Sequence, residues 1–99
     1  MESGRIIHFW LDDTRPPINT KYFWIKTYKE AIKIFTKLDK NVQIVLSTDH
    51  DLGSKKTGYD FCKWLVEEGW TGKFHCHTAN PVGAANMRQL LTHYGWEEF

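Results

Sequence analysis

Runs of strand character alternate with runs of helical character along most of this chain. Four stretches rich in β-branched or aromatic residues end in turn-forming residues, and they predict strands at residues 6–11, 22–25, 42–46 and 74–77. The third stretch, VQIVL, is almost continuously apolar, which favours a central strand buried on both faces. This alternation predicts an α/β domain with a mainly parallel sheet and right-handed crossovers.

Capping residues indicate where the helices begin. Thr27 and Glu30 have the spacing of a capping box, in which each side chain satisfies a backbone amide, so a first helix is expected to begin near Tyr28. A second helix is expected from about residue 59 to 68, with Gly69 as its stop.

A third helix is expected to open at Asn80-Pro81 and to continue to Gly95, because Asn favours the N-cap and Pro the first helical turn. Residues 12–21 include two prolines and are too few for a usual crossover. We expect them to form a loop with at most one short helical turn.

Length and composition limit the possible classes of protein. The 99 residues are enough for one domain, 1–99, and the formal net charge of +1 gives no extended basic surface for nucleic acid. Cys62 and Cys76 have neither disulfide nor zinc spacing, which indicates reduced thiols in a cytoplasmic protein. The apolar run after residues 1–5 is too short for a signal or membrane segment. The tryptophans at 64, 70 and 96 would fit either a dimer patch or the core, so the oligomeric state stays open.

Polar clusters follow three of the four predicted strands. If the strands lie in the order second, first, third, fourth, the clusters share the carboxyl edge of the sheet, and the first two flank a switch-point crevice. The clusters are Asp12-Asp13, Asp49-His50-Asp51 and Thr78-Ala79-Asn80.

The four aspartates of the first two clusters are candidate metal ligands. Carboxylates that converge repel one another, and a hard divalent cation with oxygen ligands, Mg²⁺ above all, relieves that repulsion. The alternative is that each aspartate is an ordinary turn or cap residue. The predicted metal ligands are Asp12, Asp13, Asp49 and Asp51.

Three histidines lie near this predicted edge. His50, between two carboxylates, is a candidate proton donor or acceptor, or else an exposed loop imidazole. His75 and His77 alternate on one face of the fourth strand and would suit a transition metal. The favoured interpretation is that His75 is structural and that His77, nearest the sheet edge, alone reaches the site.

The start of the third helix is a candidate phosphate site. Thr78, Asn80 and Gly83 would form an anion cradle at the helix N-terminus, although an N-cap role is sufficient to explain Asn80. Arg15 and Arg88 would each supply a guanidinium to a phosphate group.

The chain resembles receiver domains, the phospho-accepting modules of two-component signalling. The resemblance covers most of the chain and depends on motifs in a fixed order: Leu11-Asp12-Asp13, Asp49 with Leu52-Gly53, Gly58, and Thr78-Ala79. It implies a flavodoxin-like fold, a Mg²⁺-binding acidic pair at Asp12 and Asp13, a phosphorylatable Asp49 and a hydroxyl group at Thr78.

Departures from the receiver pattern predict a truncated version of that fold. We expect a small three-layer sheet in which the first helix is reduced to the loop at residues 14–21. The fifth strand, together with the lysine that grips the phosphoryl group in receivers, is expected to be missing.

A closer resemblance is to the receiver-like family predicted to process cyclic phosphates. It depends on LDDTRPP at 11–17, TDHDLG at 48–53, GYD at 58–60 and HTANPVG at 77–83, with Asn86-Met87. It implies a stand-alone catalytic domain that acts on the cyclic phosphate of a nucleotide or an RNA end.

The leading hypothesis is therefore metal-dependent hydrolysis of a cyclic phosphodiester. The alternatives are a module that binds a cyclic nucleotide without cleaving it, a single-domain response regulator, and a purely structural interaction protein. The expected catalytic residues are Asp49, His50 and Asp51, and the expected phosphate-binding residues are Arg15, His77, Thr78, Asn80 and Gly83.

Overall fold

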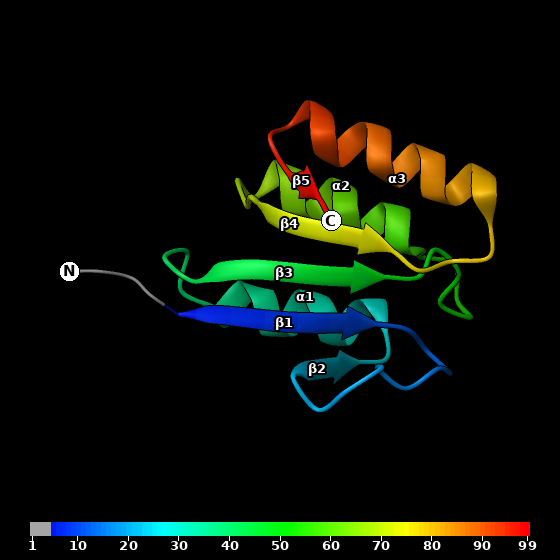
Figure 1. Cartoon of the computed structure of the whole chain (residues 1–99), viewed down its shortest axis with the longest axis horizontal. Coiled ribbons are helices and arrows are strands. Elements are labelled where there is room, and N and C mark those ends of the chain that lie inside the picture. Colours follow the sequence, from blue (N-terminus) through cyan, green and yellow to red (C-terminus); the bar gives the residue numbers. More distant parts are fainter. Residues whose placement is uncertain (1–4) are drawn as a thin grey trace.

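The computed structural model describes residues 5–99 as a parallel sheet with three helices (Figure 1). The five strands lie in the order β2-β1-β3-β4-β5, and every neighbouring pair is parallel. The expected α/β class and the order of the first four strands are therefore confirmed. The elements are β1 (Ile6–Leu11), β2 (Tyr22–Ile25), α1 (Tyr28–Lys37), β3 (Gln43–Thr48), α2 (Gly58–Glu67), β4 (Gly72–Cys76), α3 (Pro81–His93) and β5 (Glu97–Glu98).

The helices begin where capping chemistry places them. Thr27 accepts the Glu30 amide at 3.0 Å and starts α1, but the Glu30 carboxylate accepts from the Lys26 amide, one residue earlier than a capping box requires. The complete capping box lies at the start of α2, where Thr57 and Asp60 each accept the other's backbone N–H. The sequence reading missed this second box, although its spacing was visible.

All three helices cover the same face of the sheet (Figure 1). The crossovers from β2 to β3, from β3 to β4 and from β4 to β5 all advance in one direction, so right-handed connections place their helices on one side. The connection from β1 to β2 runs the other way and, over residues 12–21, contains no helix. The sheet and its helices therefore form two layers, and the expected three-layer arrangement is wrong.

The core lies between the sheet and this helical layer. Phe9, Leu46 and Phe74 point from the three central strands toward the helices and are almost fully buried. Trp70 and Trp96 are buried in the same core, and Trp64 packs against it, so these tryptophans serve core packing. The core residues are Phe9, Leu11, Ile25, Ala31, Phe35, Val42, Ile44, Leu46, Leu52, Phe61, Cys62, Leu65, Trp70, Phe74, Met87, Leu91 and Trp96.

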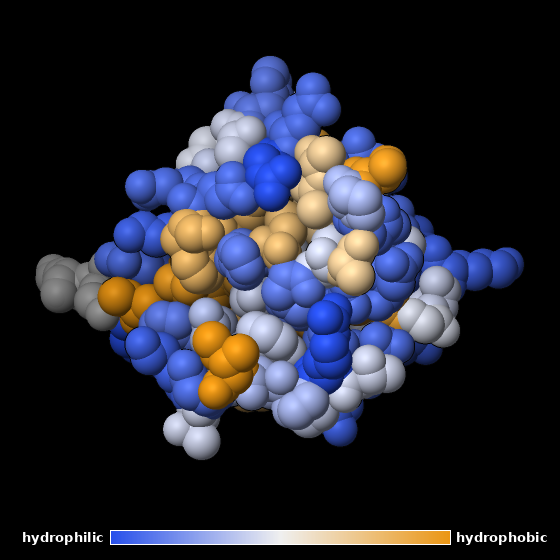
Figure 2. Space-filling model, turned by 45° about the vertical axis from the view of Figure 1, so that its right-hand side comes forward, coloured by the Kyte–Doolittle hydropathy of each residue, from blue (hydrophilic) through white to orange (hydrophobic). Residues whose placement is uncertain are grey.

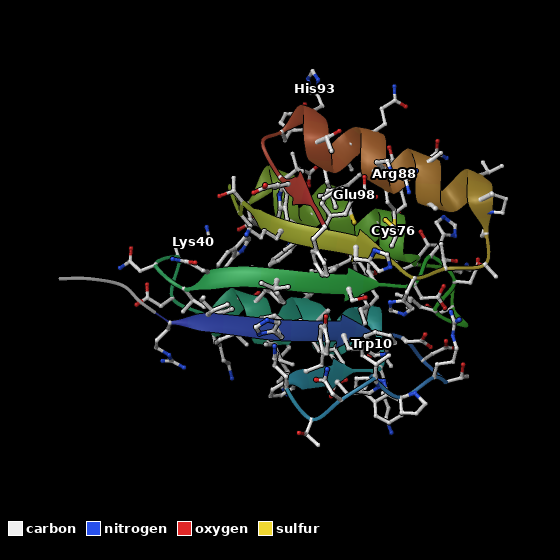
Figure 3. The ribbon with its side chains drawn as sticks, viewed as in Figure 1. Trp10, Lys40, Cys76, Arg88, His93 and Glu98 are labelled. Carbon is white, nitrogen blue, oxygen red and sulfur yellow. The ribbon has the colours of Figure 1, made fainter. Side chains whose placement is uncertain are left out.

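A fifth strand is present, so the expectation that it is missing is also wrong. β5 pairs with β4, and the Phe99 amide donates to the Phe74 carbonyl at 2.9 Å just beyond it. The Arg88 guanidinium on α3 binds the Glu98 carboxylate at 2.8 Å, which joins the strand to the helix (Figure 3). Two consecutive glutamates have no apolar alternation, so the sequence contained no strand signal at this position.

The remaining boundaries differ by a few residues from those expected. β3 runs on to Thr48, and β4 ends at Cys76, so His77 lies just past the strand. The prediction of no signal segment fell partly on residues 1–4, which lie outside the described residues. Among residues 5–99, the helices are too short and too polar to cross a membrane.

Burial of the two thiols predicts slow alkylation of the folded protein. Burial raises the pKa of Cys76 to about 11, with Arg88 opposing and Glu98 adding to the effect, and burial also raises the pKa of Cys62. At pH 8, Cys76 should react with iodoacetamide about a hundredfold more slowly than an ordinary thiol, because only the thiolate is nucleophilic. Mass spectrometry of timed samples measures this, and a guanidinium-unfolded control should react at the ordinary rate. Equal rates in the two states would contradict the burial.

Candidate functional site

Parallel pairing brings the ends of β1 and β3 side by side. Leu11 pairs with Thr48, and the Asp49 amide donates to the Leu11 carbonyl at 2.9 Å. On the other side of β1, the Asp12 amide donates to the Ile25 carbonyl at 3.0 Å. Asp12 and Asp49 are therefore each the first residue after one of two neighbouring strands, and the backbone fixes both.

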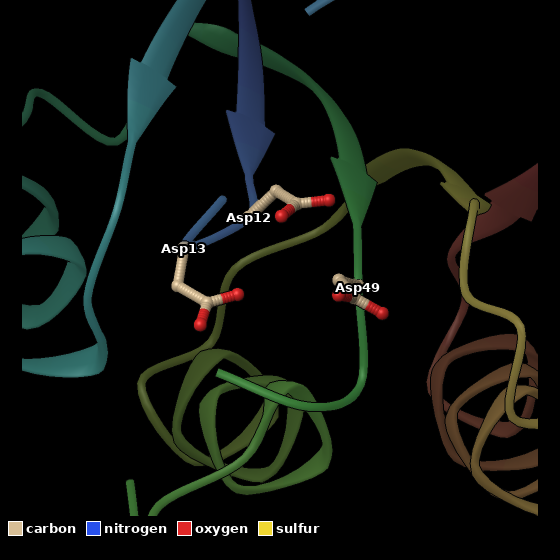
Figure 4. Close-up of side chains that lie close together, drawn as sticks. All are labelled: Asp12, Asp13 and Asp49. Atoms are coloured by element: carbon tan, nitrogen blue, oxygen red, sulfur yellow. The ribbon is translucent and has the colours of Figure 1, made fainter. Parts of the chain in front are cut away.

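Three carboxylates converge at this edge. Asp12, Asp13 and Asp49 each offer an oxygen, and these oxygens lie within 4.8 Å of one another. Figure 4 shows the three side chains gathered beyond the ends of β1 and β3. Asp12 is fully buried and Asp49 nearly so, which makes their charges expensive unless they are compensated.

Asp12 is compensated by four hydrogen bonds. Its Oδ1 accepts the Thr14 and Arg15 amides, both at 2.9 Å, and its Oδ2 accepts Arg15 Nε and His77 Nε2, both at 3.0 Å. Burial favours the neutral acid, but these hydrogen bonds and the guanidinium outweigh it, so the pKa of Asp12 lies below its usual value. Asp12 is therefore an ionised carboxylate that its hydrogen bonds hold in a fixed position.

Arg15 connects the two buried aspartates. Its side chain contacts Asp12 Oδ2 at 3.0 Å and Asp49 Oδ2 at 3.3 Å, and it also donates to the His77 carbonyl at 3.2 Å. Half of the side chain is exposed, so the guanidinium faces solvent while it holds the carboxylates. Arg15 was expected to bind phosphate. Its half-exposed side chain lies between the acidic cluster and solvent.

His77 is held in one orientation by three neighbours. Its Nε2 contacts Asp12, its Nδ1 lies 2.8 Å from Ser47 Oγ, and its ring stacks on Trp10 at 3.8 Å between centroids. Burial lowers the pKa of His77 below its usual value, despite the opposing effect of Asp12. A neutral ring between these partners carries its proton on Nε2, donates it to Asp12, and accepts the Ser47 hydroxyl at Nδ1.

His50 packs against the start of α3. Its ring fills the space where a side chain at Gly83 would lie, and its Nδ1 is 3.2 Å from Asp51 Oδ1 and 3.4 Å from Asn80 Nδ2. The shorter contact indicates that Nδ1 donates to Asp51, which leaves Nε2 for proton transfer. Asp51 is two-thirds exposed and lies outside the three-carboxylate cluster, unlike the other expected metal ligands.

The start of α3 already uses most of its polar groups within the chain. The Asn80 side-chain oxygen Oδ1 accepts the backbone N–H of Gly83 at 2.9 Å, and the backbone N–H of Asn80 donates to Thr78 Oγ1 at 3.1 Å. Pro81 has no N–H. These bonds fit the capping role of Asn80 better than the predicted anion cradle. Gly83 has no side chain, which leaves space for the His50 ring. Arg88, the second arginine expected to bind phosphate, forms an ion pair with Glu98 instead.

Two glycines of the receiver-like motifs support the site, and so does Ser47, which was not singled out from the sequence. A Cβ at Gly58 would overlap the Asp49 carbonyl, and a Cβ at Gly53, where φ is 69°, would lie 2.8 Å from Asp13 Oδ2. Both glycines let the backbone approach the aspartates closely. Ser47 could have been noticed as a polar residue in an apolar strand. His75 Nδ1 lies 3.2 Å from the Phe99 carbonyl, so it does not pair with His77.

The acidic cluster suits a hard divalent cation. Three carboxylates and one guanidinium leave two negative charges uncompensated, and oxygen is the ligand that Mg²⁺ prefers. All four acceptor positions of Asp12 are already used, so a cation would have to displace a donor. The exposed Arg15 side chain is the donor that is free to turn outward.

The lowered pKa of His77 predicts a pH dependence of stability. Its usual pKa is 6.5, so below this pH the unfolded chain binds a proton that the folded state resists, and the free energy of unfolding should fall as the pH drops. Replacing His77 with Gln should flatten this fall between pH 6.5 and 5 in denaturant titrations with EDTA. His8, whose pKa is lowered by burial and by Lys21, should preserve part of the slope. An unchanged slope in the variant would contradict the assignment.

Comparison with known proteins gives one match. The family described as the cyclic-phosphate processing receiver domain matches residues 7–93, which include every residue of the acidic cluster together with His50 and His77. No curated protein and no solved structure matches the chain. The match covers most of the chain, so the chain belongs to the cyclic-phosphate processing receiver domain family.

Proposed function

We propose that the protein hydrolyses the cyclic phosphate of a nucleotide or of an RNA end, with a divalent cation held by Asp12, Asp13 and Asp49. The convergence of these three carboxylates beside Arg15 carries the proposal, because it joins a cation site to a phosphate-binding group. Family membership adds the cyclic phosphate as the substrate class. Mg²⁺, once bound, would supply Lewis acidity toward the phosphoryl oxygens.

Arg15 and His50 would bind the phosphate and transfer the proton. Arg15, displaced from Asp12 and Asp49, binds non-bridging phosphate oxygens. His50, oriented by Asp51, accepts a proton from the attacking water at Nε2 while one P–O ester bond of the ring breaks. The proton then passes from His50 to the former ester oxygen, so the product is an acyclic phosphomonoester with a new hydroxyl group.

Asp49 has a second role open to it. Its Oδ1 accepts the His50 amide at 2.8 Å and its Oδ2 binds Arg15, so the carboxylate is held at the edge of the pocket beside a guanidinium. Attack by Asp49 on phosphorus would give an aspartyl-phosphate that water then hydrolyses. β5 consists of Glu97 and Glu98, so this strand supplies no lysine to grip a phosphoryl group, which favours hydrolysis over a lasting phosphorylated state.

Cation binding should depend on Asp13. Replacing Asp13 with Asn removes a ligand charge from the side chain that faces Gly53, so the affinity for Mn²⁺ or Mg²⁺ should fall at least about tenfold. Isothermal titration calorimetry measures it. The matched control is Asp39→Asn, an exposed turn aspartate whose bond from the Asn41 amide an asparagine oxygen preserves. Equal loss in both variants, or no cation binding by the wild type, would contradict the cation site.

Turnover should depend on Asp49. With Mg²⁺, the protein should open at least one member of a panel of 2′,3′-cyclic nucleotides, 3′,5′-cyclic nucleotides, cyclic dinucleotides and RNA with a cyclic end. Asp49→Asn should lower kcat/KM at least about a hundredfold, because it weakens both the cation site and the possible nucleophile. Phosphorus NMR of the products follows ring opening, and Asp39→Asn should keep full activity.

Two results would redirect the proposal. Stoichiometric binding of a cyclic nucleotide that is recovered intact after long incubation would identify a binding module without catalysis. Stable labelling of Asp49 by a small phosphodonor such as acetyl phosphate, without ring opening of any substrate, would identify a response regulator.

A further inference from the structure

The face of the sheet opposite the helices contains an aromatic trough. Trp10, Ser47 and His75 lie side by side in register on β1, β3 and β4, and their side chains point away from the helices. Trp10 and Ser47 are almost fully buried, so they form the floor of the trough. Figure 3 shows Trp10 near the carboxyl end of β1.

The trough has walls on two sides. Tyr22 of β2 and Ile18 of the preceding loop line one side, and Phe99 lies beside His75 on the other, with 5.7 Å between the two ring centroids. The trough is open to solvent and has a volume of about 370 Å³, near the lower end of small-molecule sites. Figure 2, in which the carboxyl edge is turned forward, shows an apolar patch near the middle of a mostly hydrophilic face.

The trough is continuous with the acidic edge. His77 lines the trough and also contacts Asp12 at 3.0 Å. Trp10, which forms the floor, donates its indole N–H to the Arg15 carbonyl at 2.8 Å. A ligand whose phosphate lies at Arg15 and the carboxylates therefore has this trough beside it.

We infer that the trough binds the nucleobase of the substrate, which restricts the substrate class to cyclic phosphates that carry a base. This inference rests on the proposed function for the placement of the phosphate. Planar aromatic walls suit a planar ring, because bases stack on aromatic side chains whatever their hydrogen-bonding pattern. The trough is narrow and bounded, so it fits one or two rings better than the broad apolar patch that a second copy of the chain requires.

Phe99 offers a test that leaves the fold intact. Its side chain is 52% exposed and lines the trough, whereas Phe23 is 53% exposed and lies on the edge strand outside it. Adenosine and uridine, which carry a base but no phosphate, should shift the NMR signals of the Trp10 indole N–H and of Phe99. Phe99→Ala should weaken this binding about five- to tenfold, as expected for the loss of one stacking partner, and Phe23→Ala should not change it.

A second measurement connects the trough to catalysis. Phe99→Ala should raise KM for adenosine 2′,3′-cyclic phosphate by a similar factor and leave kcat nearly unchanged, because the base lies away from the reacting phosphorus. Glycerol 1,2-cyclic phosphate, which has no base, should be a poor substrate, and Phe99→Ala should not alter its turnover.

The outcomes separate this inference from the proposed function. Nucleosides that bind elsewhere or not at all, or equal turnover of the two cyclic phosphates, would overturn the base site while hydrolysis stands. Phe99-dependent nucleoside binding without turnover of any cyclic phosphate would support the base site and reject hydrolysis. Sedimentation that shows a dimer dispersed by Phe99→Ala, without nucleoside binding, would assign the trough to self-association and overturn the inference.

Discussion

Parallel pairing between β1 and β3 is the constraint on which the site depends. It places Asp12 and Asp49 at adjacent strand ends, and the hydrogen bond from the Asp49 amide to the Leu11 carbonyl sets their separation. β2 and β4 flank this pair. The backbone of Asp12 therefore bonds to Ile25 at the end of β2, and its side chain contacts His77, just after β4. The carboxylates are thus positioned by backbone that belongs to the most buried part of the sheet.

The buried polar side chains of the described residues are all hydrogen-bonded. Within residues 5–99, no buried side-chain nitrogen or oxygen lacks a hydrogen-bond partner, and Asp12, Ser47 and His77 form one connected network. Such a network costs little once it is satisfied but penalises any change that leaves one member unpaired. The aspartate that anchors the site is therefore held by its neighbours before any ligand arrives.

Much of this arrangement was predictable from the sequence, for identifiable reasons. Apolar runs and caps predicted β1 and β2 at their observed bounds, and the position of Asp12 and Asp49 after strands predicted that they would meet. β5 was not predictable, because two glutamates pair there through backbone groups that leave no side-chain pattern. The two-layer architecture was open to prediction from the handedness of the crossovers.

Side-chain partners within the site were harder to predict. The contact between His77 and Asp12 spans β3, which lies between β1 and β4, so no local spacing in the sequence predicts this partner. The position of His77 nearest the sheet edge did predict that it, and not His75, reaches the site. The role of Gly83 was also hidden, because an absent side chain gives no sign of which neighbour occupies its space. Asp51 has the same residue type as Asp49 but lies on the solvent side of the turn.

The parallel order of strands has a consequence for how the chain acquires its site during synthesis. Until β3 has been synthesised, β1 has only β2 as a neighbour, and a two-stranded sheet alone is marginal in water. The acidic edge therefore forms only after β3 has been made, and His77 joins it later still, after β4. The three carboxylates therefore come together only in a chain whose two innermost strands, β1 and β3, have already paired.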